Sequence, residues 1–144
     1  MNLRSLQKAS PIAIMADESV CDHHDARRLI ELDAVRYFNI KLGKSSGLLK
    51  AQKIVRMTES AGIRLQIGGF LESRLAFTAS AHLALTSSQI EFIDFDTPLM
   101  FELDPIQGGI NYDNKGFITV PDLPGLGAIP DPVYLRTLPV KIIG

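Results

Sequence analysis

The stretch "IAIMADES", Ile12 to Ser19, passes from five apolar residues directly into two adjacent acids, Asp17 and Glu18. A short apolar run without polar alternation is typical of a strand that is buried on both faces. Three similar runs follow along the chain: "YFNIKL" from Tyr37, "IRLQIG" from Ile63 and "IEFIDF" from Ile90. Successive starts lie 25, 26 and 27 residues apart. This nearly constant spacing predicts four equivalent strands.

Segments with helical spacing separate these runs. The first is "DHHDARRLIEL" with Asp22 as a possible cap, the second is "GLLKAQKIVRMTESAG" closing at Gly62, and the third is the alanine-rich "RLAFTASAHLALTS". Each unit therefore reads as a strand followed by a helix, which indicates a parallel sheet covered by helices, either a β/α barrel or a doubly wound sheet. No glycine fingerprint for a dinucleotide follows the first run, which favours the barrel.

The two ends of the chain depart from this pattern. The opening "NLRSLQKAS" resembles a helix that ends before Ser10, as if it closed an earlier unit, so we expect the beginning of the barrel to be missing. After Pro98 the spacing stops, and "GGINYDNKGFITVP" predicts a β-hairpin around a turn at 114–116. We predict an α/β fold in which residues 1–97 form about four β/α units, the carboxyl-terminal half of a (β/α)8 TIM-type barrel. Residues 98–144 would form a hairpin and a tail that wraps the barrel or contacts a capping domain.

Composition excludes several classes of protein. The 144 residues are 46% hydrophobic and 22% charged, as in ordinary globular domains. Fifteen basic and sixteen acidic residues give a formal charge of −1, so no broad basic face is available for nucleic acid. The single Cys21 cannot form an internal disulfide, and no apolar run of about 18 residues predicts a membrane span. We therefore expect a cytoplasmic protein without nucleic-acid or membrane partners.

Polar residues stand where each predicted strand ends. Asp17 and Glu18 follow the first run, and Lys41 interrupts the otherwise apolar second run. The third run leads into "GGFLES", and the fourth ends in "DFD", whose Asp94 and Asp96 share one face because strand side chains alternate. The carboxyl ends of barrel strands carry the chemistry of β/α barrels. We therefore expect these side chains to meet in one mouth.

Simpler roles remain open for each group. Asp17 and Glu18 could cap the following helix. Lys41 could form a purely structural ion pair, and Asp94 and Asp96 could be loop acids that end a strand.

Together these residue types suit the removal of a proton next to a carboxylate. Mg²⁺ binds carboxylate oxygens and usually requires more than one acid, and Asp17 is one credible ligand. A lysine in a dry mouth near a metal would have its ammonium form disfavoured, so Lys41 suits a general base. The metal would stabilise the enediolate that forms, and Asp94 and Asp96 would suit an ammonium group on the same substrate.

Six segments, in sequence order, resemble the later half of the enolase superfamily in its muconate-lactonizing subgroup, and most closely the dipeptide epimerases. They are "PIAIMADES", "YFNIKLGKSSG", "GGFLESRLAFTASAHLA", "IDFDTPLM", "GGINY" and "VPDLPGLG". The resemblance extends to about Gly127. It implies that Asp17 is the last of three carboxylate ligands of Mg²⁺ and that Lys41 is one of two catalytic bases. It also implies that Asp94 and Asp96 grip the amino terminus of a dipeptide, beside a substrate loop that includes Gly69, Leu71 and Glu72.

The resemblance also defines what this sequence does not contain. Complete members of the family add a capping domain and four earlier barrel strands, which carry the second lysine and two more metal ligands. We therefore expect the isolated chain to bind Mg²⁺ weakly or not at all and to be inactive without an amino-terminal half. Two alternatives stay open: a non-catalytic half-barrel that self-associates, and another superfamily reaction such as cycloisomerisation or o-succinylbenzoate synthesis.

Overall fold

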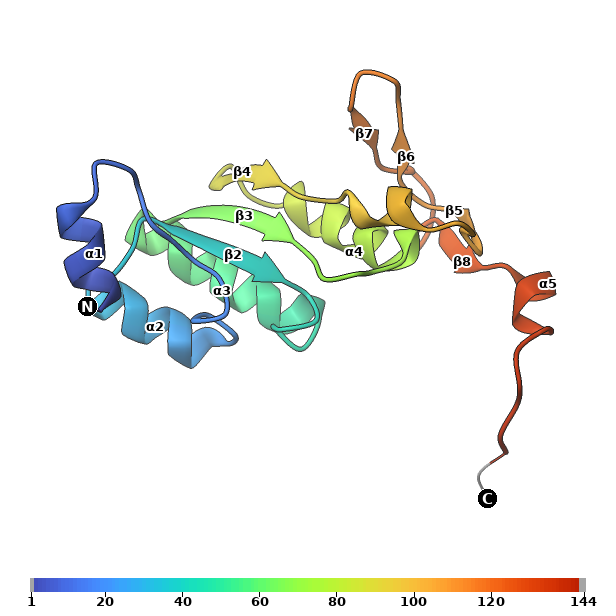
Figure 1. Ribbon diagram of the computed structural model, residues 1–144, viewed down its shortest axis with the longest axis horizontal. Helices are drawn as coiled ribbons and strands as arrows, with labels where there is room; N and C mark the ends of the chain where they lie inside the picture. Colours follow the sequence, from blue (N-terminus) through green and yellow to red (C-terminus); the bar gives the residue numbers. More distant parts are fainter. Residues whose placement is uncertain (1, 143–144) are drawn as a thin grey trace.

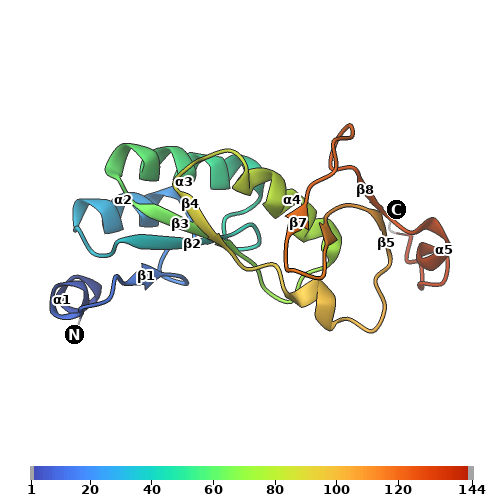
Figure 2. The same cartoon turned by 90° about the horizontal axis from the view of Figure 1, so that it is seen from above.

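A computed structural model describes residues 2–142 and contains a sheet of four parallel strands in the order β1-β2-β3-β4 (Figure 1). The strands are β1 (Met15–Ala16), β2 (Tyr37–Lys41), β3 (Arg64–Gly68) and β4 (Ile90–Ile93). The helices that alternate with them are α1 (Leu3–Ala9), α2 (His23–Glu31), α3 (Leu48–Ala61) and α4 (Arg74–Ala84). Figure 2 shows α2, α3 and α4 along one face of the sheet. The predicted succession of strands and helices is confirmed.

The ends of the helices follow from local sequence. Asp22 caps α2, because its carboxylate accepts hydrogen bonds from the amides of His24 and Asp25. Gly62 ends α3 in a left-handed conformation with φ of 68°, which glycine adopts without strain. Since Asp22 provides the cap, the alternative that Asp17 or Glu18 caps this helix is wrong.

The first strand is shorter than the sequence predicts. The apolar run begins at Ile12, yet only Met15 and Ala16 pair with β2, opposite Tyr37 and Phe38. Ile12 is 73% exposed. Of the residues before Met15, Ile14 still accepts hydrogen bonds from the Arg36 and Tyr37 amides through its carbonyl oxygen, at 3.1 and 3.2 Å. Pro11, next to Ile12, has no amide hydrogen to donate to a ladder.

The core lies between the sheet and the helices. Alternate residues of β2 and β3 face α3 and α4 and are fully buried together with apolar residues of those helices: Phe38, Ile40, Ile54, Leu65, Ile67 and Phe77. Strand alternation therefore places Asn39 and Lys41 on the opposite face. Their register partners on β3 are Gln66 and Gly68.

The segment after residue 96 contains the predicted hairpin and a pairing that was not predicted. A 3₁₀ turn η1 (Thr97–Met100) leads to β5 (Ile106–Gly108), and the hairpin is β6 (Asn111–Tyr112) with β7 (Ile118–Thr119). β5 also pairs antiparallel with β8 (Ala128–Pro130), which precedes the short helix α5 (Pro132–Leu135). Figure 1 shows α5 and the tail extending away from the sheet. Within residues 2–142, no helix combines the length and apolar character needed to cross a bilayer.

Candidate active site

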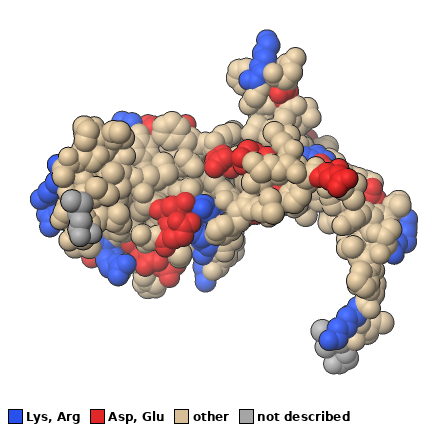
Figure 3. All heavy atoms as spheres, viewed as in Figure 1, with Lys and Arg blue, Asp and Glu red and all other residues tan. Residues whose placement is uncertain are grey.

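Two carboxylates and two ammonium groups meet at the carboxyl ends of β1 and β2. Lys41 Nζ lies 2.9 Å from Asp17 Oδ2 and 3.1 Å from Glu18 Oε1. Lys44 Nζ lies 2.6 Å from the other oxygen, Asp17 Oδ1. Figure 3 shows acidic and basic side chains next to one another on this face. The structure therefore places Asp17 and Lys41 together, as the sequence predicted.

Lys44 was not predicted to belong to this cluster. Its side chain is only 4% exposed, and its ammonium group also donates to the carbonyl oxygens of Asp17 (2.6 Å) and Asn39 (2.9 Å). Three acceptors match its three protons, which compensates for burial of the charge. The available signal was its place three residues after Lys41, within reach of the same strand end.

Asn39 is a second residue that sequence reasoning missed. It lies two residues before Lys41 on the same face of β2, and its amide nitrogen donates to Asp17 Oδ2 at 3.2 Å. A Cβ atom at Gly68 would lie 2.8 Å from Asn39 Oδ1. Glycine at position 68 therefore provides the space in which Asn39 supports Asp17.

The surrounding charges set the protonation states of Asp17 and Lys41. Burial by itself would raise the pKa of Asp17, but hydrogen bonds and charges from Lys44 and Lys41 outweigh it and lower the pKa. Burial would likewise lower the pKa of Lys41, but Asp17 and Glu18 outweigh it and raise the pKa. Two carboxylates that contact Lys41 directly therefore favour its ammonium form in this arrangement, and the expectation for Lys41 next to a bound metal stays a prediction.

Asp94 and Asp96 lie close together just beyond β4. The amide of Asp94 continues the strand ladder by donating to the Ile67 carbonyl at 3.0 Å. Burial raises the pKa of Asp94, and the charge and hydrogen bond of Asp96 raise it further, whereas the charge of Lys41 lowers it. Asp94 and Lys41 are therefore near enough for the charge of Lys41 to affect the pKa of Asp94.

The loop after β3 reaches this cluster through a residue that was not predicted. The ring of Phe70 covers Lys41, with Nζ 4.9 Å from the ring centroid. Glu72 turns back on its own loop, where its carboxylate accepts from the Phe70 amide at 3.3 Å. Leu71 is 70% exposed. A Cβ atom at Gly69 would lie 2.5 Å from Phe77 Cζ, so packing also requires this glycine.

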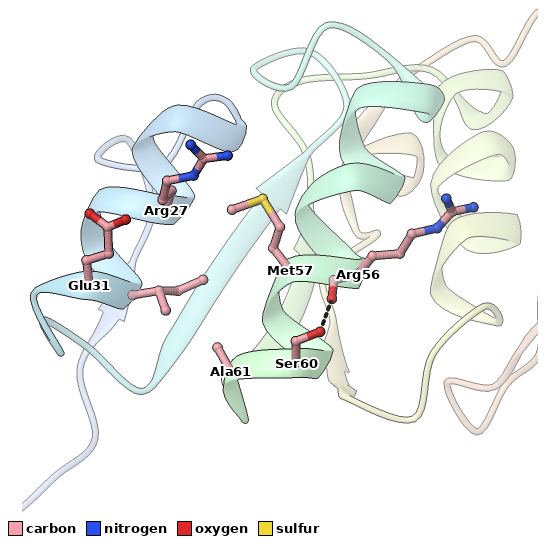
Figure 4. Close-up of a pocket in the computed structure, with 7 residues that line it drawn as sticks. Arg27, Glu31, Arg56, Met57, Ser60 and Ala61 are labelled. Atoms are coloured by element: carbon pink, nitrogen blue, oxygen red, sulfur yellow. Dashed lines mark hydrogen bonds between the residues drawn. The ribbon is translucent and has the colours of Figure 1, made fainter.

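A separate groove of about 540 Å³ lies between α2 and α3, on the helical side of the sheet (Figure 4). In Figure 4 the side chain of Arg56 extends away from that of Arg27, so the two guanidinium groups do not converge on a common ligand. The groove shares no residue with the charged cluster. It is lined by Arg27, Ile30, Glu31, Arg56, Met57, Ser60 and Ala61.

Residues 1–133 match the protein family described as enolase C-terminal domain-like. The chain belongs to the enolase C-terminal domain-like family. It is 53% identical over 136 residues to the D-Ala-D/L-Ala epimerase of Cytophaga hutchinsonii, a match that covers 94% of this chain and 37% of that protein. It is 39% identical over 127 residues to the L-Ala-D/L-Glu epimerase of Bacillus subtilis, covering 88% of this chain and 34% of that protein.

Solved structures of this enolase family give the same result. The dipeptide epimerase of Cytophaga hutchinsonii, complexed with Mg and the dipeptide D-Ala-L-Val, matches 95% of this chain and 37% of its own, with a TM-score of 0.93 and 52% identity. Muconate lactonizing enzyme from Pseudomonas putida matches 94% of this chain and 37% of its own, with a TM-score of 0.87 and 30% identity. The chain thus spans about a third of the length of these relatives. The predicted resemblance and the predicted half of a TIM-barrel domain are confirmed.

The residues present fit only part of the metal site expected of an enolase-family enzyme. Asp17 offers hard carboxylate oxygens, and Glu18 lies next to it. Over residues 2–142, however, no three His, Cys, Asp or Glu side chains are grouped closely enough to hold a metal ion. Lys44 and Lys41 each occupy one Asp17 oxygen. Asp17 therefore fits as one ligand of a site that other residues would have to complete.

Proposed function

We propose that this chain forms the carboxyl-terminal part of a dipeptide epimerase, in which Lys41 exchanges the α-proton of a dipeptide residue. The observation that carries this proposal is the position of the Lys41 ammonium group, in contact with Asp17 and Glu18 and within electrostatic reach of Asp94. The names of the most similar curated relatives, which include D-Ala-D/L-Ala and L-Ala-D/L-Glu epimerases, support a dipeptide as substrate.

Lys41 would act on one face of the substrate. In this arrangement the Asp17 and Glu18 carboxylates raise its pKa and hold it in the ammonium form. To act as a base, Lys41 must first lose part of this carboxylate contact. Magnesium, when bound, would supply positive charge that stabilises an enediolate on the substrate, and Asp17 would be one of its ligands. Inversion of a stereocentre also needs an acid or base on the opposite face, which a separate amino-terminal part would provide.

Asp94 and Asp96 would bind the amino terminus of the dipeptide. Asp96 contributes to the raised pKa of Asp94, and a nearby ammonium group on the substrate would offset the repulsion between the two carboxylates. The loop of Gly69, Leu71 and Glu72 would lie beside the substrate, and Phe70 of the same loop covers Lys41 with its ring.

A chimeric enzyme tests the proposal. The part of the Cytophaga hutchinsonii epimerase that precedes its match to this chain is joined to residues 1–144, and α-proton exchange of D-Ala-D-Ala in D₂O is followed by NMR. We expect exchange and epimerisation, and a loss of roughly 10²–10⁴-fold in kcat for Lys41→Met. Lys53→Met, which removes an exposed lysine of α3, is the matched control. A chimera that is folded by circular dichroism but exchanges no proton would contradict the proposal.

A second candidate reaction is cycloisomerisation of another carboxylate, which the structural similarity to muconate lactonizing enzyme favours. The double variant Asp94→Asn and Asp96→Asn in the same chimera separates the two. Epimerisation predicts that only substrates with a free amino terminus lose activity. Equal losses for dicarboxylates without an amino group would favour cycloisomerisation.

A further inference from the structure

The residue between the two aspartates is anchored more firmly than either aspartate. Phe95 is only 3% exposed, and its ring packs against Phe77 of α4 with the centroids 5.0 Å apart. Its carbonyl oxygen accepts a hydrogen bond from the Tyr112 hydroxyl at 2.7 Å. Both the side chain and the backbone of Phe95 are therefore held by other elements.

This anchoring determines where Asp94 and Asp96 point. Phe95 is buried whereas Asp94 and Asp96 on either side of it are exposed, and the chain turns from β4 into η1 at Asp96, whose backbone is helical with φ of −84° and ψ of −28°. The two carboxylates lie near one another, since the charge of Asp96 contributes to the raised pKa of Asp94. The Phe95 carbonyl belongs to the peptide that joins Phe95 to Asp96, so a rotation of this peptide would move the Asp96 carboxylate relative to that of Asp94, whose amide is held by the Ile67 carbonyl.

Tyr112 belongs to β6, so the hydrogen bond links the aspartates to the carboxyl-terminal hairpin. The hairpin is itself fixed to α4, since the Ile110 amide donates to the Thr78 hydroxyl at 3.0 Å. Burial raises the pKa of Tyr112 to about 12, so the hydroxyl keeps its proton over the whole physiological range.

We propose that Tyr112 is a positioning residue of the substrate site: its hydroxyl holds the peptide between Phe95 and Asp96 and thereby orients the Asp96 carboxylate relative to that of Asp94. The β6–β7 hairpin then contributes to the geometry of the substrate site, in addition to packing against the sheet and helices. The inference rests on the proposed function in one respect, that the two aspartates receive an ammonium group.

The orientation of the aspartates is tested in the 144-residue chain without any activity measurement. Tyr112→Phe removes one oxygen and keeps the ring. We expect the carboxyl ¹³C and amide ¹⁵N signals of Asp94 and Asp96 to shift, and the late-titrating tyrosine to disappear from the ultraviolet titration. Tyr134→Phe in α5 is the matched control and should leave the aspartate signals unchanged. Aspartate signals identical to those of the unmodified chain in Tyr112→Phe would overturn the proposal.

A second variant covers the case in which Tyr112→Phe does not fold. Thr78→Val removes the acceptor of the Ile110 amide and so loosens the hairpin without altering Tyr112. It should move the same two aspartate signals in the same direction by a smaller amount. Shifts confined to residues of the hairpin would contradict the link to the aspartates.

Kinetics of the chimera separate this inference from the proposed function. Tyr112→Phe should raise KM for a dipeptide with a free amino terminus roughly tenfold and change kcat much less. A roughly tenfold fall in kcat with an unchanged KM would contradict a positioning role. A chimera that is inactive even with Tyr112 in place contradicts the proposed function alone, because the aspartate signals of the 144-residue chain still test Tyr112.

Discussion

Lys44 is the residue whose charge is most deeply buried in the candidate site, and its contacts predict a clear cost of removal. Lys44→Met keeps the length of the side chain but leaves the Asp17 and Asn39 carbonyls without their donor. We expect the free energy of unfolding to fall by roughly 2–4 kcal/mol, measured by urea unfolding. Lys50→Met on the exposed side of α3 is the control, with an expected change within about 0.5 kcal/mol. Equal stability of the two variants would show that the buried ion pair contributes little.

The lowered pKa of Asp17 predicts how the free energy of unfolding changes as the pH falls. Its pKa in the folded chain is below the ordinary value of 3.8, because Lys44 and Lys41 outweigh the effect of burial. The unfolded chain therefore binds the proton more readily, so the contribution of Asp17 is fully present above about pH 3.8 and is lost as the pH falls through the folded pKa. Urea unfolding at a series of pH values should show this loss, and Asp17→Asn should lower stability at neutral pH and make the acid loss shallower. An unchanged acid profile in Asp17→Asn would refute the assignment.

At the scale of single residues, the sequence predicts those side chains that a strand carries to its own end. Asp17, Lys41 and the aspartate pair were found in this way, because period-two alternation and parallel strands fix their direction. Lys44 sits in a turn, where a lysine is ordinarily solvated. Only the path of its side chain back toward β2 makes it part of the site, and the strand pattern does not specify that path.

Among the elements, α4 holds the carboxyl-terminal segment through Arg74. Its guanidinium group bonds to the Asp104 carboxylate and to the backbone carbonyls of Ile106 and Gly108, with Ile110 O at 3.4 Å. Arg74→Ala should therefore increase hydrogen exchange at the Gly109 and Ile110 amides by at least about tenfold, since the β5 end is released. Arg28→Ala on the exposed face of α2 serves as the comparison and should leave these amides protected. Protection unchanged in Arg74→Ala would mean that the β5–β8 pairing alone holds the segment.

Helices and strands could be predicted from the sequence where neighbouring residues specify them. Capping residues, apolar periodicity and the hairpin turn predict α2, α3, α4 and the β6–β7 pair. β5 and β8 are strands of only three residues each, and their pairing joins residues that lie more than about twenty positions apart in the sequence. No local sequence pattern specifies such a pairing. The division of the chain at 97/98 stays a prediction, and the Arg74 contacts show that the two parts meet at α4.

At the scale of the molecule, the sheet has two edges within the described chain, β1 and β4. Ile93 of β4 is 48% exposed and Phe92 is 49% exposed, so this edge combines apolar side chains with unpaired backbone groups. We expect the mass in sedimentation equilibrium to rise above the 15.8 kDa of one chain as concentration increases. Ile93→Lys should shift the distribution toward the single chain.

The matched comparison is Leu49→Lys, which adds the same charge at an exposed apolar position of α3, away from the edge. An equal effect of both substitutions would attribute association to general solubility and not to the β4 edge. A constant mass of 15.8 kDa at every concentration would remove self-association as a role for this chain. The fold itself was predictable at this scale because the strand-helix unit repeats, whereas the state of association depends on surfaces that no repeat encodes.

The crowding at Gly69 has a consequence for how such proteins diverge. Any side chain there would strike Phe77, and Phe77 in turn supports Phe95 between the two aspartates. Lineages that gain bulk at position 69 should therefore lose it at position 77, and the two positions should covary across homologues. The position of the two aspartates could then change through compensating substitutions at Gly69 and Phe77, with Asp94 and Asp96 themselves unchanged.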